Sequence, residues 1–544
     1  MMRFLGLLAC LLLLNGCAAH RMLPASTHTA EGGLKAKYYQ METTTHDGNR
    51  LAFTLYQPAL AAGQTAPLVL HTHGFGLWRM GNPHMGLYAS IMPTGKMAKR
   101  AWRTGYWVIS WDSRGSGDTD GRIRVADPDY EIRDISTLID WAVANLPQLA
   151  AKEGDPLIGM VGESLGGGQQ YLASAMDSRI DALVPLTTWY DLETALAPQG
   201  VPKDGWLSLL NFVGEWVNFR KFDPEVRAAY KAASKGNVPA STYHLLDTHR
   251  MRWFCDRERA PKADVLMVQG FRDVLFNFNQ ALEARQCLLD AGRDVRLIGQ
   301  DGGHLLPVAQ YSPGLNPPVW YVRKKLHCAG QTLDLFDMVQ NWFDGKLRNQ
   351  TERLATIPDF CIDNAPHDAA ALQATQTWPL PAITLGAGGR FEGWLKPLDH
   401  VGNWFVPARL PKDWQQPMSG SVRPARLPLT VIEQDAWLVG VPRLRLQVQD
   451  IDPENSAMLY VHLAAWRPGS GSYRVLSEQV MPFNNRRMQA RIEAAREAGL
   501  SAEVEAKIAA EANGVELPAV QARLKKGEVL GLLISSYSNQ FSRS

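Results

Sequence analysis

A pentapeptide of the form Gly-x-Ser-x-Gly, spanning Gly162 to Gly166, constrains the fold of this chain more than any other feature. The apolar run PLIGMV leads into it, and the small-residue run GGQQYLASAM follows it. This order predicts a strand, a sharp turn that carries Ser164, and a helix. Glycines on both sides let the strand and the helix pass closely, and the turn exposes the hydroxyl at the helix N-terminus. We therefore expect Ser164 to be an exposed nucleophile.

Short apolar strands and helices alternate on both sides of this motif. Strands that are separated by helices predict an α/β fold with a largely parallel, doubly wound sheet. Ligands of such a sheet bind at the carboxyl ends of its strands. The expected strands lie within residues 50–58, 66–76, 106–121, 156–163, 180–189 and 263–273, and a helix is expected within 130–146. We assign residues 46–375 to this catalytic domain.

Two further regions depart from the alternation. Between about 190 and 260, helical stretches rich in tryptophan and phenylalanine predict a helical cap above the carboxyl edge of the sheet, with an extra packing layer as the alternative. From 376 to 544, prolines, glycines and alternating runs predict a C-terminal, all-β, jelly-roll-like sandwich. A polar, alanine-rich stretch at about 486–512 predicts a helical insertion in that domain.

The N-terminal sequence MMRFLGLLACLLLLNGC has one arginine, a short apolar stretch and a small-residue cleavage region. This pattern predicts a secretory signal and not a transmembrane helix. Its end resembles a bacterial lipobox in which Cys17 receives the lipid, although Asn15 departs from the usual residue. We expect a lipoprotein-type signal peptide at 1–17 and a tether at 18–45; a plain signal peptide that is cleaved nearby is the alternative.

Lipidation at Cys17 would anchor the exported protein to a bacterial membrane, facing the periplasm or the exterior. The residue after Cys17 is Ala18 and not the aspartate that would resemble an inner-membrane retention signal. This favours the outer membrane. The membrane, reached through this lipid, is thus an expected partner. Basic and acidic residues number 56 and 54, for a net charge of +2, and are interspersed, which argues against nucleic acid.

Four cysteines follow the signal, namely Cys255, Cys287, Cys328 and Cys361. In an oxidising compartment they can form two disulfides, and the sequence leaves three connectivities open. The local pairings would join Cys255 to Cys287 and Cys328 to Cys361. Buried free thiols are the alternative. The spacing does not match a zinc site.

A serine nucleophile needs a base, and the base needs an acid that orients it. After a turn of this kind the expected order is Ser, then Asp or Glu, then His. Asp273 follows one buried strand, and His304 lies in a glycine loop after the next. Both fall at the expected active edge, although Asp301 is a local competitor for the acid. We predict Ser164, Asp273 and His304 as the catalytic triad.

Two backbone N–H groups should form an oxyanion hole beside the serine. Leu165 supplies the first, and Phe75 is expected to supply the second because glycines flank it. His71 and His73, nearby, lack acidic partners at ligand spacing, so we expect them to support the loop and not to bind a metal. No metal or cofactor is predicted.

Four stretches together carry a family resemblance: DSRGSGDTDG at 112–121, GESLGGG at the turn, QGFRDVLF at 269–276 with GGH at 302–304, and the C-terminal LVGVPRLRLQVQ. The chain resembles the α/β-hydrolases that group Xaa-Pro dipeptidyl-peptidases (peptidase family S15), cocaine-esterase-like (CocE/NonD) enzymes and α-amino acid ester hydrolases. Members usually carry an oxyanion tyrosine where this chain has Phe75. Many carry an aromatic residue before the nucleophile, where this chain has Glu163.

The triad and the resemblance imply a serine hydrolase that cleaves an ester or a peptide or amide bond through an acyl-enzyme. It would act as an Xaa-Pro dipeptidyl-peptidase or a small acyl esterase, on a small-molecule or peptide substrate. A dipeptidyl-peptidase needs an anionic recess for the free α-amine, and Glu163, Asp191 and Glu193 are the candidates. The alternative is a non-catalytic, lipid-anchored binding protein that retains the fold. The oligomeric state is left open.

Overall fold

The computed structural model describes residues 33–217, 221–235, 238–304, 322–328, 330–363, 424–444, 458–477, 479–484 and 515–535, with scattered residues between 489 and 541. The predicted signal peptide with Cys17, and the predicted domain boundary at 375, lie outside the described residues. Within these ranges we find no helix that is long and apolar enough to cross a membrane.

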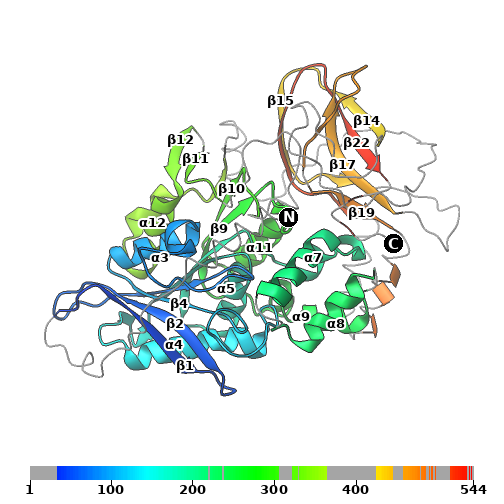
Figure 1. Ribbon diagram of the computed structural model, residues 1–544. Helices are drawn as coiled ribbons and strands as arrows, with labels where there is room; N and C mark the ends of the chain where they lie inside the picture. Colours follow the sequence, from blue (N-terminus) through cyan, green and yellow to red (C-terminus); the bar gives the residue numbers. More distant parts are fainter. Residues whose placement is uncertain are drawn as a thin grey trace.

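A nine-stranded sheet forms the centre of the first domain (Figure 1), in the order β1-β2-β4-β3-β7-β8-β9-β10-β13. The strands are β1 (Lys37–Thr44), β2 (Arg50–Gln57), β3 (Leu68–Thr72), β4 (Trp107–Trp111), β7 (Ile158–Glu163), β8 (Ile180–Leu186), β9 (Asp264–Gly270), β10 (Val295–Gln300) and β13 (Phe360–Ile362). β2 pairs antiparallel with β1 and β4, and the strands from β4 to β13 pair in parallel. The predicted, largely parallel sheet is therefore confirmed.

Strand β1 corrects the predicted tether at 18–45. It pairs with β2 along its whole length, from Lys37 opposite Gln57 to Thr44 opposite Arg50. Only Tyr39 and Gln40 of this strand are buried. An edge strand with polar, exposed side chains resembles a linker in sequence, which is why the prediction was wrong for these residues.

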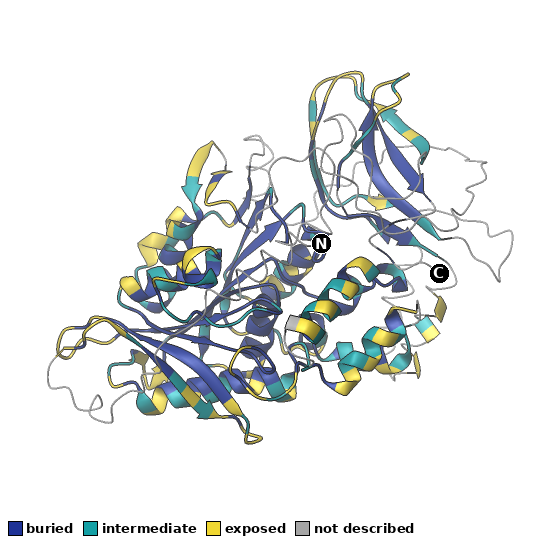
Figure 2. Ribbon diagram, viewed as in Figure 1, coloured by how far each residue is buried: buried dark blue, intermediate teal, exposed yellow. Residues whose placement is uncertain are grey.

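Helices cover both faces of the sheet. α4 (Arg133–Asn145), α5 (Leu165–Met176) and α11 (Phe278–Asp290) pack in one apolar cluster, and α3 (Pro93–Arg103) and α12 (Leu335–Leu347) pack in another. In β3, Leu68 and Leu70 join the first cluster and Val69 joins the second. Alternation along a strand thus supplies two cores. Figure 2 shows the strands buried and the outer helix faces exposed.

The cap predicted at about 190–260 is helical. It contains α6 (Leu192–Leu196), η3 (Pro198–Gly200), α7 (Asp204–Phe212), η4 (Val213–Val217), α8 (Pro224–Ala233), α9 (Ala240–Asp247) and α10 (Met251–Cys255). These elements lie between β8 and β9 in the chain, so the cap follows the end of a central strand.

The C-terminal region is an antiparallel β-structure, as predicted. One sheet contains β14 (Ala425–Val431), β22 (Val529–Ser535), β17 (Leu459–Trp466), β18 (Arg474–Val475) and β19 (Met481–Phe483). Two strand pairs join β15 (Ala436–Gly440) to β21 (Val520–Leu524) and β16 (Arg443–Leu444) to β20 (Val515–Glu516). Apolar residues of the sheet and of both pairs share one core. Of the predicted helical insertion at 486–512, residues 489–490, 492–493 and 496–497 are helical and the rest lie outside the described residues.

The two domains touch through hydrogen bonds and an apolar cluster. The Asn279 side chain on α11 donates to the carbonyl of Leu517 at 3.1 Å and accepts from the N–H of Ala519 at 2.8 Å. Val201, which precedes α7, packs in a buried cluster with Tyr460 of β17. The C-terminal domain therefore contacts α11 and the first part of the cap.

Both local disulfide pairings are present. Cys255 at the end of α10 is bonded to Cys287 in α11, and Cys328 at the end of β11 (Lys325–Cys328) is bonded to Cys361 in β13. The first bond ties the last cap helix to a helix that covers the sheet. Among the three connectivities open to the sequence, the structure has the local one.

Candidate active site

Ser164 lies at the turn between β7 and α5, with φ 54° and ψ −118°. A residue other than glycine keeps a positive φ only where its surroundings hold it there. The Ser164 N–H donates to the carbonyl of Leu186 at 2.9 Å, and its carbonyl accepts from the Thr188 hydroxyl at 2.9 Å. These bonds to the end of β8 hold the strained turn, which is the conformation that the sequence motif predicts.

The glycines of the motif are required by the end of β3. A Cβ at Gly162 would lie 2.4 Å from Cγ2 of Thr72, and one at Gly166 would lie 2.7 Å from the same atom. No side chain fits at either position without moving β3. The turn therefore packs directly against the strand that leads into the predicted oxyanion loop.

Ser164, His304 and Asp273 form one line of contacts. His304 Nε2 lies 3.1 Å from Ser164 Oγ, and His304 Nδ1 lies 2.6 Å from Asp273 Oδ2. All three residues are buried, with 7%, 3% and 1% of their surface exposed for Ser164, His304 and Asp273 respectively. This is the geometry in which a carboxylate orients an imidazole that accepts the serine proton.

The loops that carry the acid and the base meet at glycines. A Cβ at Gly270 would lie 1.9 Å from the carbonyl oxygen of Gly302, and one at Gly303 would lie 2.6 Å from that of Arg272. The Arg272 N–H donates to the Gly302 carbonyl at 3.0 Å. Because β9 and β10 are parallel neighbours, their carboxyl ends bring both loops to the same edge.

Asp273 is held by the backbone that follows it. Its Oδ1 accepts the N–H groups of Leu275 at 2.9 Å and Phe276 at 2.8 Å, while Oδ2 contacts His304 and, at 3.4 Å, the side-chain amide of Gln269. Asp301, the local competitor, is 38% exposed at its side chain and pairs with Arg323. Asp301 therefore does not orient the histidine.

The two predicted oxyanion donors lie on either side of the β3–β7 contact. Leu165 begins α5, so its N–H points from a helix N-terminus, and Phe75 lies in the loop after β3. Gly76, next to Phe75, has φ 76°, a conformation that glycine adopts without strain. Within the described residues, neither N–H donates to a protein acceptor. Their role as oxyanion donors stays a prediction.

His71 and His73 support the oxyanion loop. His73 Nε2 accepts the N–H of Ser113 at 3.0 Å, so its Nδ1 donates to the carbonyl of Gly74 at 2.8 Å. His71 lies 2.8 Å from the Ser110 hydroxyl. Burial lowers the pKa of His73, and that of His71 to about 3, which keeps both rings neutral. In the described part of the chain, no three His, Cys, Asp or Glu side chains gather as metal ligands do.

Glu163, a candidate anchor for a substrate amine, instead holds this loop from within the fold. Its Oε1 accepts the Gly74 N–H at 3.1 Å and the Tyr88 hydroxyl at 2.7 Å, and its Oε2 accepts the Thr94 hydroxyl. It is 1% exposed, and burial raises the pKa of its carboxyl. Glu163 therefore fixes the loop that carries Phe75.

The other two candidate anchors belong to a buried ion-pair network in the cap. Arg250 contacts Asp191 at 3.2 Å and Glu193 at 3.1 Å, and Arg252 contacts Asp191 at 2.9 Å. The Asp191 side chain also caps the N-terminus of α6 by accepting from the N–H of Glu193 at 3.1 Å. Both carboxylates are thus engaged inside the protein.

Aromatic side chains surround the base. The rings of Trp206 and Phe276 approach the imidazole of His304 edge-on, with centroids 5.6 and 5.0 Å away. Phe75 stacks on Phe222 at 5.8 Å, which brings the segment before α8 over the oxyanion loop. The cap therefore contributes to an apolar environment around the triad.

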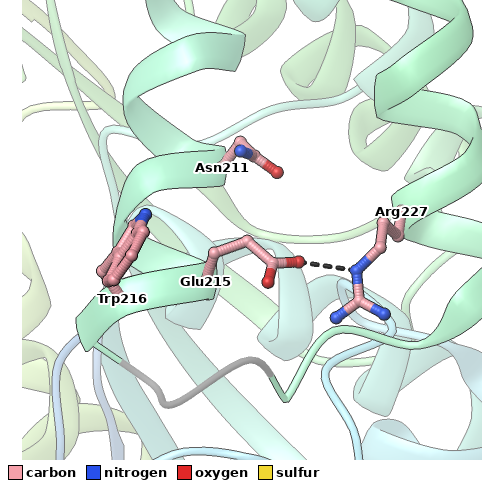
Figure 3. Close-up of a pocket in the computed structure, with 4 residues that line it drawn as sticks. All are labelled: Asn211, Glu215, Trp216 and Arg227. Atoms are coloured by element: carbon pink, nitrogen blue, oxygen red, sulfur yellow. Dashed lines mark hydrogen bonds and ion pairs between the residues drawn. The ribbon is translucent and has the colours of Figure 1, made fainter.

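A separate hollow of about 410 Å³ lies within the cap and is lined by Asn211, Glu215, Trp216 and Arg227. Figure 3 shows these side chains on the adjoining cap elements, with Glu215 accepting from Arg227 Nε at 2.6 Å. None of the triad residues lines it. The hollow is therefore distinct from the catalytic groups.

Sequence reasoning missed two residues that hold the triad. Gln269 accepts the Thr188 N–H at 3.1 Å and donates to the carbonyl of Phe276 at 2.5 Å, so it joins the turn of the serine to the loop of the acid. Trp206 covers His304 from the cap. Gln269 is the last residue but one of the buried strand β9, where a polar residue is a usable signal. Nothing in the sequence around Trp206 points to the triad.

The first domain is similar to a known protein family. Residues 47–306 match the family model of X-Pro dipeptidyl-peptidase (S15 family). These residues include Ser164, Asp273 and His304. The matched region, 260 of the 544 residues, is similar to this family.

Some solved structures resemble the chain over nearly its whole length, the first domain together with the C-terminal region. An aminopeptidase from a marine sediment Thaumarchaeota archaeon has a TM-score of 0.61, covering 97% of this chain and 93% of its own. An α-amino acid ester hydrolase has 0.59, covering 97% and 94%, and a CocE/NonD family hydrolase from Staphylococcus aureus has 0.54, covering 96% and 92%. Each is 14% identical, so these likenesses show the fold. The expected resemblance is confirmed.

Curated relatives match only in part. An uncharacterised 31.7 kDa protein of Escherichia coli is 27% identical over 151 residues, which cover 27% of this chain and 47% of that protein. The chain thus spans less than half the length of this curated relative.

We predict that Glu163→Ala lowers kcat about tenfold and leaves KM within about twofold. Loss of the carboxylate removes one of the two acceptors of the Gly74 N–H and the acceptor that orients the Tyr88 hydroxyl, so the Phe75 N–H is held less firmly. Complete loss of an oxyanion donor costs about 100- to 1,000-fold, and a loosened donor is expected to cost less. Steady-state kinetics on an ester substrate measure the change. Glu352→Ala, at an exposed position, is the control. Equal kinetics for wild type and Glu163→Ala would show that the loop does not depend on Glu163.

Proposed function

We propose that the protein is a serine hydrolase that transfers an acyl group from an ester or amide to water. The observation that carries this proposal is the unbroken line from Asp273 through His304 to Ser164, with contacts of 2.6 and 3.1 Å. A buried triad at the carboxyl edge of a parallel sheet, on a strained strand-to-helix turn, is the arrangement that activates a serine.

The geometry gives each group a step in the reaction. Ser164 Oγ attacks the substrate carbonyl while His304 Nε2 takes its proton, and Asp273 stabilises the imidazolium through Nδ1–H. The N–H groups of Leu165 and Phe75 receive the oxyanion. His304 returns the proton to the leaving group as the acyl-enzyme forms. Water, deprotonated by His304, then releases the acid and restores the serine.

We further propose that the preferred substrates are esters with an uncharged acyl group. The solved aminopeptidase and α-amino acid ester hydrolase are named for substrates with a free α-amine, which needs a carboxylate partner. In this chain the three candidate carboxylates, Glu163, Asp191 and Glu193, are engaged by internal donors. The aromatic rings around His304 suit an apolar acyl group better than an ammonium group.

We expect a fluorophosphonate probe to label the wild-type protein and not Ser164→Ala. The probe needs only an activated serine, so it tests the reaction class without knowledge of the substrate. Labelling is read by gel fluorescence and by mass spectrometry of the peptide that contains Ser164. An unlabelled, folded wild-type protein would favour the alternative of a non-catalytic binding protein.

The substrate proposal predicts a higher kcat/KM for p-nitrophenyl butyrate than for Gly-Pro-p-nitroanilide. It also predicts that acetylating the amine of Gly-Pro-p-nitroanilide does not reduce cleavage, because the three candidate carboxylates are engaged by donors within the protein. The matched pair isolates the contribution of the amine. Cleavage of the free dipeptide substrate at least tenfold faster than its acetylated form would instead identify a dipeptidyl-peptidase.

Export and lipid anchoring at Cys17, with the outer membrane as destination, belong to the same proposal. Support comes from the lipobox-like sequence and from the two disulfides, which suit an oxidising compartment. We predict that a bacterial host incorporates labelled palmitate into the wild type and into Cys10→Ser, but not into Cys17→Ser. Membrane fractionation then locates the anchor. Palmitate in Cys17→Ser would contradict the assignment of the lipidated residue.

A further inference from the structure

Lys203 precedes α7 and buries a charged side chain directly behind the catalytic acid. It is 1% exposed, and its Nζ donates to the carbonyl of Val274 at 3.0 Å and to that of Leu275 at 2.9 Å. A buried ammonium group is costly unless its protons are hydrogen-bonded. Burial lowers the pKa of Lys203 to about 7, and the charge of Asp273 acts in the opposite direction.

The carbonyls that Lys203 contacts belong to the same two peptide groups that hold Asp273. The peptide between Val274 and Leu275 accepts from Lys203 at its oxygen and donates its N–H to Asp273 Oδ1 at 2.9 Å. The peptide between Leu275 and Phe276 does the same, with an N–H contact of 2.8 Å. A cation at the oxygen of a peptide strengthens its N–H as a donor, because linked hydrogen bonds polarise one another.

We infer that Lys203 is a positioning residue of the triad, which holds Asp273 aimed at His304 through these two peptide groups. The inference rests on the proposed serine hydrolase function. In this arrangement Oδ1 of Asp273 is bound to the polarised backbone, and Oδ2 contacts His304 at 2.6 Å, with a longer contact of 3.4 Å from the Gln269 amide.

The segment that carries Lys203 is fixed at both ends. Val201 is fully buried against Tyr460 of the C-terminal domain, and Trp206 lies against His304. The Lys203 N–H also donates to the carbonyl of Leu196 at 2.8 Å, which ties the segment to α6. Lys203 thus links the C-terminal domain and the cap to the acid of the triad.

The charge of Lys203 should affect the pH dependence of the reaction, which a neutral side chain in the same place would not do. The negative charge of Asp273 favours the protonated form of Lys203 and so raises its pKa, and Asp273 also binds His304. The charges of Lys203 and of a protonated His304 therefore both interact with the same carboxylate, His304 directly and Lys203 from behind the two peptide groups. Removing the lysine charge favours the protonated imidazole, which cannot accept the serine proton, so the acid limb of the pH–rate profile moves to higher pH.

The test compares Lys203→Met, Lys203→Arg and, as a control on the surface of α3, Lys96→Met. For Lys203→Met we expect kcat to fall about 10- to 100-fold, KM to stay within about twofold, and the acid limb to rise by about one pH unit. Lys203→Arg retains the cation and its donors, so its acid limb stays at the wild-type pH. Lys96→Met should match the wild type in every measurement.

A Lys203→Met enzyme with reduced kcat and an unmoved acid limb would overturn the inference, because it would show a structural tie alone. If this variant does not fold, Lys203→Gln removes the charge and keeps one donor, and the same comparison decides. The titration of His304, followed by NMR in protein with ¹⁵N-labelled histidine and assigned with His304→Asn, gives the answer without turnover. An inactive wild-type enzyme would contradict the proposed function. A pKa of His304 that is the same in the wild type and in the variant without the lysine would contradict this inference.

Discussion

The close approach of β3 to the turn between β7 and α5 is the contact on which the site depends. Thr72, at the end of β3, leaves no space for a side chain at Gly162 or Gly166, and between these glycines Ser164 is held at φ 54°. The same strand continues into the loop that carries Phe75. One strand contact thus places the nucleophile and the predicted oxyanion donors relative to each other, and preorganised donors of this kind cost no reorganisation during the reaction.

A second close approach places the acid and the base. Gly270 and Gly303 let the loops after β9 and β10 touch through their backbones. These two strands are parallel neighbours in the sheet, so their loops leave it side by side. The second approach needs glycine because backbone meets backbone, and the first because both the methyl group and the carbonyl oxygen of Thr72 lie where a Cβ would be. The aromatic rings of Trp206 and Phe276 then shield His304 from water, which strengthens the electrostatic contacts within the triad. The sheet places the groups, and the cap sets their environment.

The parts of the molecule that sequence predicts are those encoded locally. The elbow, the apolar strands and the order of the triad follow from short patterns, and the structure brings Ser164, Asp273 and His304 together. Strand β1 was missed because a polar edge strand has the composition of a linker. That the Glu163 side chain points into the fold was missed, because the residue type does not reveal which hydrogen-bond donors surround a carboxylate. Lys203 could not be found, since its partners lie some seventy positions further along the chain and no periodicity connects them.

The hydrogen bonds that fix Gly74 compensate for Phe75, which stands where members of the similar family usually have an oxyanion tyrosine. Without that hydroxyl, Phe75 can offer only its backbone N–H, so the stiffness of the loop decides how well the donor is placed. His73 holds the Gly74 carbonyl, and Glu163 with Tyr88 holds the Gly74 N–H. Both polar groups of the residue before Phe75 are therefore fixed. The buried carboxylate of Glu163 is unfavourable for stability, as its raised pKa shows, but it fixes the backbone of a loop that has no hydroxyl to contribute.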